Sequence, residues 1–258
     1  MRLGWSVWLA VASLASAAVL AQAPDKARKT ILAVGAHAGD MEVAAGAVLA
    51  KHAKAGDRVV FLHLTLGEGG NPTLSPADYG AQKRREAEAA AKVIGAEVVF
   101  GPYKDGELPD TEETRRFVAD VIRQLKPTHL IAHWKKSLHK DHSVASAVAV
   151  DAVLLASLAG VTSRYPPHRG LWRVLFTENW EDREEFSPYV YVEVTDALDA
   201  WEKCVTQYQF IRGGVSSFPY LEYYKALARV RGAEGGFTFA ECFDVQPWGK
   251  KQAVRALP

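Results

Sequence analysis

The chain has 258 residues, which is enough for one large α/β domain and short of two comfortable ones. Hydrophobic residues make up 48% of it and charged residues 24%, as is ordinary for a soluble globular protein. The formal net charge is +1, so composition gives no electrostatic case for binding nucleic acid or an anionic membrane. We therefore expect neither among its partners.

The first residues are typical of an export signal. Arg2 precedes a continuous apolar stretch from Trp5 to Leu20, and small residues follow at Ala21 and Ala23. A positive end, an apolar core and a small-x-small site are the three parts of a secretory signal peptide. We predict a signal peptide over residues 1–23, cut after Ala21 or after Ala23. An uncleaved membrane anchor is the alternative, although the apolar run is a little short for a stable span.

The mature domain is expected to cover residues 24–258 and to be exported, either periplasmic or secreted. No membrane contact is expected beyond the export signal. An exported protein occupies a compartment that permits disulfides. Cys204 and Cys242 therefore either pair or remain two buried free thiols, and their spacing does not decide between these alternatives.

Apolar runs that fit buried strands alternate with helix-like stretches through the first half. The expected strands cover residues 30–36, 58–65, 97–100 and 128–133. The expected helices cover residues 40–55, 77–94, 111–125 and 141–158, with a loop over 67–76. This alternation predicts an α/β fold with a doubly wound, mostly parallel sheet and helices on both faces.

The second half is less regular, and no linker divides it from the first. Strands are expected over residues 172–177, 189–194 and 236–243, and helices over 196–210 and 220–230. We expect these elements to add edge strands and to wall one side of a cleft.

The first and fourth strands are commonly neighbours in such a sheet, at the point where the winding reverses. Ligands bind there, outside the carboxyl ends of the strands. The first strand leads to His37 and the fourth to His133, which opens the stretch "HWKKSLHKDH". The two histidine-rich turns should therefore face each other.

These turns carry residue types that bind metal ions. His37 and Asp40 stand on the first turn, and His139, Asp141 and His142 follow the fourth strand. Catalytic zinc typically takes three nitrogen or oxygen ligands and leaves one position for water. Taken singly, each histidine is also typical of a hydrogen-bonded loop, and Asp40 of a helix N-cap. The two clusters together favour a metal site.

Five stretches occur in the order in which one enzyme family carries its motifs. They read "GAHAGDME", "TLGEGG", "KRREAEAAAKVIG", "HWKKSLHKDH" and "GFTFAECF". The chain resembles the PIG-L/LmbE-like family of zinc-dependent N-acetylglucosaminyl deacetylases over nearly the whole mature domain. The resemblance implies a Rossmann-like α/β fold, one bound zinc ion, and hydrolysis of the acetamide of an amino sugar or a related conjugate.

Matched position by position, His37, Asp40 and His142 correspond to the three metal ligands of that family. His139 corresponds to the histidine that assists the tetrahedral intermediate. Asp141 corresponds to the carboxylate beside the last ligand, which orients a histidine. Histidine and carboxylate ligands suit iron and manganese as well as zinc, so the residues leave the choice of metal open.

The sequence departs from the family at one catalytic position. Members usually read His-Pro-Asp-Asp-x-Glu, in which the first Asp is the general base. Here the order is His37-Ala38-Gly39-Asp40, so a glycine stands at the base position and has no group to accept a proton. A general base typically contributes about 10²–10⁴-fold in rate. Restoring it by Gly39→Asp is expected to keep or raise activity if the cavity admits a carboxylate.

Other carboxylates are candidates for the missing base. Glu68, on the loop after the second strand, is the best-placed substitute. Glu42 follows Asp40 by two helical positions and should point away from it, so it is expected to be structural.

An acidic stretch after a later strand is a further candidate, and it holds Glu178, Glu181 and Asp182. A solvated loop is the alternative reading of that stretch. Trp180 within it suits the apolar face of a sugar. The resemblance also places Arg84 as a substrate-facing residue.

The sequence therefore predicts a metal-dependent hydrolase that deacetylates a small-molecule N-acetylated sugar or glycoconjugate. Gly39 keeps a second interpretation open, a non-catalytic, zinc-containing sugar-binding protein derived from such an enzyme. A hydrolase of another amide or an ester is the third.

Overall fold

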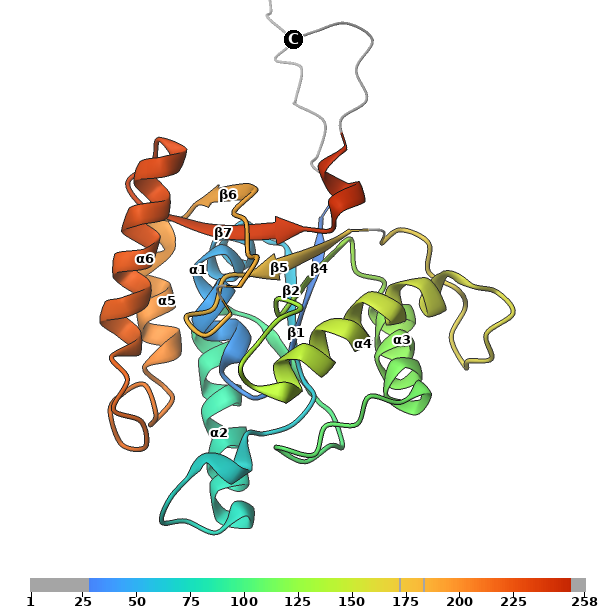
Figure 1. Ribbon diagram of the computed structural model, residues 1–258, viewed down its shortest axis with the longest axis horizontal. Helices are drawn as coiled ribbons and strands as arrows, with labels where there is room; N and C mark the ends of the chain where they lie inside the picture. Colours follow the sequence, from blue (N-terminus) through green and yellow to red (C-terminus); the bar gives the residue numbers. More distant parts are fainter. Residues whose placement is uncertain (1–27, 172, 183, 252–258) are drawn as a thin grey trace, which may run out of the picture.

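The computed structural model describes residues 28–171, 173–182 and 184–251, so the predicted signal peptide lies outside the described residues. Seven strands form one sheet: β1 (Thr30–Gly35), β2 (Arg58–His63), β3 (Glu97–Phe100), β4 (His129–Ala132), β5 (Val174–Thr177), β6 (Val190–Glu193) and β7 (Ala240–Val245). Their order across the sheet is β3-β2-β1-β4-β5-β7-β6 (Figure 1). The first five strands are parallel, and β7 is antiparallel to both of its neighbours.

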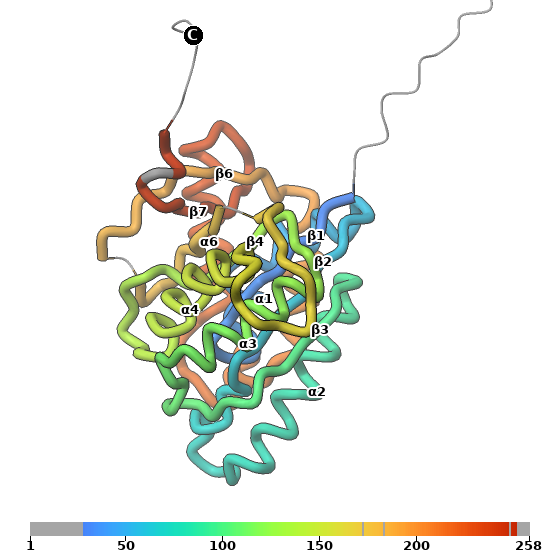
Figure 2. The backbone as a smooth tube through the Cα atoms, turned by 90° about the vertical axis from the view of Figure 1, so that its right-hand side faces the viewer, coloured from blue at the N-terminus to red at the C-terminus, as the bar shows by residue number. Residues whose placement is uncertain are grey.

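The helices are α1 (Asp40–Lys54), α2 (Pro76–Ile94), α3 (Glu112–Leu125), α4 (Lys140–Ser157), α5 (Leu198–Val205) and α6 (Tyr220–Gly235). Three short 3₁₀ turns cover Glu68–Gly70, Thr195–Ala197 and Pro247–Lys250. In Figure 1, α3 and α4 cover one face of the sheet, whereas α1, α2, α5 and α6 lie on the other. Seen from the side, β6 and β7 lie at one end of the molecule and α2 at the other (Figure 2).

Alternate residues of the parallel strands feed two separate cores. Ile31 and Ala33 of β1 pack in the core beneath α1, α2 and α5, whereas Leu32 and Val34 pack in the core beneath α3 and α4. Successive side chains of a strand point to opposite faces of the sheet, so a strand buried on both faces reads as a continuous apolar run. The doubly wound sheet predicted from the sequence is therefore confirmed.

The predicted neighbours at the centre of the sheet are also confirmed. β1 pairs with β4 in parallel, with Ile31 opposite His129 and Val34 opposite Ala132. The two turns that carry the histidines consequently leave the sheet side by side at its carboxyl edge.

The second half differs from expectation in its boundaries. The helix expected over 196–210 is a 3₁₀ turn followed by α5, which ends at Val205. The strand expected from residue 236 begins at Ala240, because Gly236 adopts a φ of 77° and caps the longer helix α6.

Cys204 and Cys242 are both buried and free, which decides between the alternatives left by the sequence. Among residues 28–171, 173–182 and 184–251, no helix combines the length and apolar character needed to span a bilayer.

Candidate functional site

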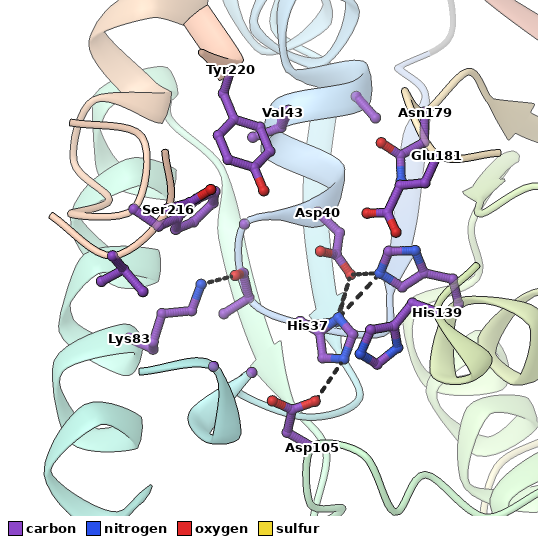
Figure 3. Close-up of a pocket in the computed structure, with 18 of the residues that line it drawn as sticks. His37, Asp40, Val43, Lys83, Asp105, His139, Asn179, Glu181, Ser216 and Tyr220 are labelled. Carbon is purple, nitrogen blue, oxygen red and sulfur yellow. Dashed lines mark hydrogen bonds and ion pairs between the residues drawn. The ribbon is translucent and has the colours of Figure 1, made fainter. Parts of the chain in front are cut away.

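A cavity opens at the carboxyl edge of the sheet, where α/β proteins commonly bind ligands. The segments that follow the first five strands all contribute to its lining, through His37, Gly67, Asp105, His133 and Asn179. The segment between α5 and α6 supplies the facing wall (Figure 3).

The three predicted metal ligands converge in this cavity. His37 Nδ1 lies 3.2 Å from Asp40 Oδ2 and 3.2 Å from His142 Nε2. His142 Nε2 lies 3.5 Å from the same oxygen of Asp40. A tetrahedral zinc ion with bonds of about 2.1 Å would set its donor atoms about 3.4 Å apart. The spacing of these three atoms therefore fits one shared cation.

The second nitrogen of each histidine ring has its own partner. His37 Nε2 lies 3.0 Å from Asp105 Oδ1, and His142 Nδ1 lies 3.2 Å from Ser137 Oγ. Such partners hold the proton on the outer nitrogen and direct the lone pair of the other nitrogen inward. Two inward lone pairs 3.2 Å apart need a proton or a cation between them.

The charges in the cluster agree with this arrangement. Burial raises the pKa of Asp40, but His37 and His142 outweigh it and hold that pKa well below the ordinary value. Burial lowers the pKa of His37, yet Asp40, Asp105 and Asp141 together leave it well above the ordinary value. Burial and the neighbouring His133 lower the pKa of His142 to about 2. Without metal the cluster keeps its proton on His37, and a divalent cation would displace it.

Asp40 does not act as a helix N-cap. Gly39 holds that position, and Asp40 is the first residue of α1. Its Oδ2 accepts a hydrogen bond from the backbone N–H of His37 at 2.7 Å and lies 3.1 Å from His133 Nε2. These contacts aim the carboxylate at the histidine cluster instead of at the helix backbone.

His139 lies on the cavity wall with its ring centroid 4.6 Å from that of His37. Its Nδ1 accepts the backbone N–H of Asp141 at 3.3 Å, so Nε2 carries the proton of the neutral ring. Burial and the neighbouring His37 lower the pKa of His139. A neutral ring with a free N–H suits donation to a developing oxyanion. The nitrogens of His37, His139 and His142 also form a possible three-histidine ligand set.

The histidine that the carboxylate of Asp141 contacts is His37. Asp141 Oδ2 lies 3.6 Å from His37 Nε2 and accepts the backbone N–H of Gly106 at 2.7 Å. The polar partner of the adjacent His142 is Ser137. Asp141 therefore orients His37 from the side of α4, together with the nearer Asp105.

No carboxylate fits at the position of the missing base. Gly39 has a φ of 107°, a conformation that L residues rarely adopt. A β-carbon added there would lie 2.9 Å from the ring of Phe210 and 3.5 Å from Lys83 Nζ. The space of the family's aspartate is therefore filled by side chains from the segment after α5 and from α2.

Lys83 brings a positive charge to this wall. Its Nζ donates to the carbonyl oxygen of Ala38 at 2.5 Å and lies 4.3 Å from the centroid of Phe210 and 4.8 Å from that of Tyr208. Burial lowers the pKa of Lys83, although nearby carboxylates, with Asp40 first, oppose the shift. The ammonium group lies beside the cavity in Figure 3.

Two predicted residues lie in a different cavity, which corrects their assignment. Glu68 and Arg84 line a neighbouring hollow between α2 and the segment after β3. Glu68 Oε1 accepts the backbone N–H of Asp105 at 3.1 Å, and the guanidinium of Arg84 stacks 4.0 Å from the centroid of Phe100. Gly67, with a φ of 72°, turns the chain so that the next side chain leaves the histidine cavity.

Trp180 does line the histidine cavity, and its ring stacks on Phe218 with centroids 4.3 Å apart. In the acidic stretch, Glu181 also lines the cavity, whereas Glu178 is paired with Arg231. Glu42 is fully buried and accepts the hydroxyl of Tyr208 at 2.6 Å, in agreement with a structural role.

Sequence reasoning missed three residues that line the cavity, Asp105, Lys83 and Phe210. Asp105 had a readable signal, because a carboxylate after the third strand must emerge at the same edge of the sheet. Lys83 is the first residue of the stretch "KRREAEAAAKVIG", whereas Phe210 had no signal. Only packing between α2, α1 and the segment after α5 brings the two beside Gly39.

Comparison with known proteins agrees with this geometry. A family model described as PIG-L, GlcNAc-PI de-N-acetylase, matches residues 32–153, which include all three converging ligands. A 4-oxalmesaconate hydratase of Pseudomonas putida is 27% identical over 219 residues, covering 80% of this chain and 81% of that protein. A diacetylchitobiose deacetylase of Thermococcus kodakarensis is 24% identical over 230 residues, covering 83% and 81%.

The conserved protein TT1542 of Thermus thermophilus has the same fold, with a TM-score of 0.75 and 28% identity. The match covers 89% of this chain and 100% of that structure. The family match over residues 32–153, the shared fold and the converging histidine and aspartate side chains together support one conclusion: the chain is similar to the PIG-L family.

Proposed function

We propose that this protein is a metal-dependent hydrolase that removes an N-acetyl group from an amino sugar or a related conjugate. The observation that carries the proposal is the convergence of His37 Nδ1, Asp40 Oδ2 and His142 Nε2 within 3.5 Å of one another in an open cavity. The diacetylchitobiose deacetylase among its relatives supports the substrate class.

The residues of the cavity have distinct roles under this proposal. His37, Asp40 and His142 hold one divalent cation, which we take to be zinc. When bound, that cation would polarise the acetamide carbonyl and acidify a water molecule. The Nε2–H of His139 donates to the developing oxyanion. Trp180 offers its ring to the apolar face of the sugar, fixed by its stacking on Phe218.

Hydration of an unsaturated carboxylate is the second candidate function. The similarity to 4-oxalmesaconate hydratase favours it, and so does Lys83, whose positive charge on the cavity wall suits an anionic substrate. In both reactions water adds to a carbon atom that a polarised carbonyl makes electrophilic, directly in the amide and through the conjugated alkene in the hydration, so the same cation and histidines would serve either one.

The test is an assay of metal-loaded protein over a panel of N-acetylated amino sugars and unsaturated dicarboxylates. Release of acetate and a free amine in equal amounts supports the deacetylase. Loss of the alkene absorbance without acetate release supports the hydratase. Tight sugar binding without turnover would overturn both and support the sugar-binding protein.

The proposal extends to location, because residues 1–23 have the three parts of a signal peptide. Fractionation of expressing cells, followed by N-terminal sequencing, tests it. A mature chain beginning at Gln22 or Pro24 in the exported fraction is expected, and a full-length chain in the cytoplasm would contradict it.

A further inference from the structure

Residue 39 supplies no base, so a hydrolase of this kind needs a carboxylate from another part of the cavity wall. Among the described residues, three carboxylates line the cavity: Asp40, Asp105 and Glu181. Asp40 is directed at three histidines. Asp105 contacts His37 Nε2 through Oδ1 and accepts the backbone N–H of Gly69 through Oδ2, both at 3.0 Å.

Glu181 differs from the other two. It lies on the segment after β5, and Figure 3 shows its carboxylate directed toward Asp40 and the histidine cluster from the side opposite Lys83. Among the described residues, none forms an ion pair with it. Its carboxylate is thus aimed at the place where an acetamide would meet the metal ligands.

The backbone beside Glu181 is firmly held. Asn179 Oδ1 accepts the hydroxyl of Tyr224 at 2.5 Å and the backbone N–H of Trp180 at 2.8 Å. Trp180 in turn stacks on Phe218, with ring centroids 4.3 Å apart. These contacts tie the segment to α6 and to the wall of the cavity, so the backbone that carries Glu181 is held in place.

The surroundings of Glu181 suit proton transfer. Burial first, and then Asp182 and Asp40, raise its pKa, while His133 and His37 oppose the shift. Tyr220 of α6 also faces it across the cavity. A carboxyl group whose pKa lies closer to neutrality is a better acid–base catalyst at neutral pH than an ordinary glutamate.

We propose that Glu181 is the acid–base residue of this enzyme, in place of the aspartate that the family carries at position 39. The proposal rests on the hydrolase function proposed above. The carboxylate of Glu181 removes a proton from the attacking water as the new C–O bond forms. It then gives that proton to the amide nitrogen as the C–N bond breaks, which releases acetate and the free amine.

The first experiment compares Glu181→Gln with the wild type on the best N-acetylated substrate. A lost general base lowers kcat by about 10²–10⁴-fold, whereas KM and the zinc content stay within a few-fold of the wild type. The acidic limb of the pH–rate profile should disappear with it. Glu184→Gln is the matched control, because Glu184 is exposed, pairs with Lys136 and does not line the cavity.

An N-trifluoroacetyl substrate sharpens the comparison. Its carbonyl is attacked more readily, so the deficit of Glu181→Gln should be smaller with it than with the N-acetyl substrate. A residue with only a structural role would lower both rates equally. Wild-type kcat in Glu181→Gln, or equal deficits on both substrates, would overturn the assignment.

A second readout does not depend on turnover. In protein labelled with ¹³C at glutamate carboxyl carbons, the resonance missing from Glu181→Gln should titrate above the ordinary pKa of about 4.3. Zinc should lower that pKa through its positive charge. An ordinary pKa that zinc leaves unchanged would refute the role of Glu181. If the wild type releases no acetate from any compound, the proposed function fails, and this titration still decides whether Glu181 faces the metal.

Discussion

The ring of Phe210 fills the space into which any side chain at Gly39 would project, with 2.9 Å between an added β-carbon and the nearest ring atoms. The glycine and the aromatic ring are therefore complementary. A carboxylate at residue 39 would therefore have no room beside Phe210.

Gly39→Asp should consequently not restore a base, contrary to the expectation from the sequence. The φ of 107° and the contact with Phe210 should lower the free energy of unfolding by about 1–3 kcal/mol, and activity should fall. Urea denaturation and the amine-release assay measure the two effects. The double variant with Phe210→Ala should be less destabilised than the sum of the single variants. A fully stable, more active Gly39→Asp would contradict the filled space.

His142→Ala should lose bound zinc and activity together, because His142 Nε2 lies within 3.5 Å of both other ligand atoms. His139→Ala should keep zinc but lose activity, since oxyanion donors contribute about 10²–10³-fold in kcat. Elemental analysis after dialysis against zinc measures the zinc content of the two variants. Loss of zinc from His139→Ala with retention in Asp40→Ala would instead identify the three-histidine set as the ligands.

Trp180→Ala and Arg84→Ala each remove a side chain that lines one of two neighbouring cavities. Trp180→Ala should raise KM for the sugar about tenfold, because an aromatic face worth ~1–1.5 kcal/mol is removed from the histidine cavity. Arg84→Ala should leave KM unchanged, since its guanidinium stacks on Phe100 outside that cavity. Steady-state kinetics of the two variants measure KM for the sugar. A larger rise in KM for Arg84→Ala would mean that the substrate extends into the second cavity.

The free energy of unfolding should fall as pH rises, because of Glu241. Its two carboxyl oxygens accept the backbone N–H groups of Ala47 and Val48 at 3.0 and 2.8 Å, and burial raises its pKa from 4.5 to about 8. Between these two pH values the unfolded chain releases the proton of Glu241 while the folded chain keeps it. The free energy of unfolding therefore falls as pH rises, by up to about 1.4 kcal/mol per unit, and levels off above pH 8.

Urea midpoints measured at several pH values between 5 and 8 test this slope. Glu241→Gln cannot titrate and should flatten it, whereas Glu184→Gln on the surface should not. An unchanged slope in Glu241→Gln would assign the pH dependence to other groups.

The sequence by itself determined the order of strands and helices in the first half and the pairing of β1 with β4. It also determined the meeting of His37 and Asp40 with His142. These features depend on local patterns: buried parallel strands are apolar runs, and residues just after them must leave the sheet at its carboxyl edge.

Only the tertiary structure decided which other side chains share the cavity. Phe210 and Lys83 reach Gly39 from segments far away in the chain. Glu68 lies at the predicted edge of the sheet, but its side chain lines a neighbouring hollow. A side chain's direction depends on the backbone turn that carries it and on the elements packed around it. Neither can be read from residue type or spacing, because both arise only when distant segments come together.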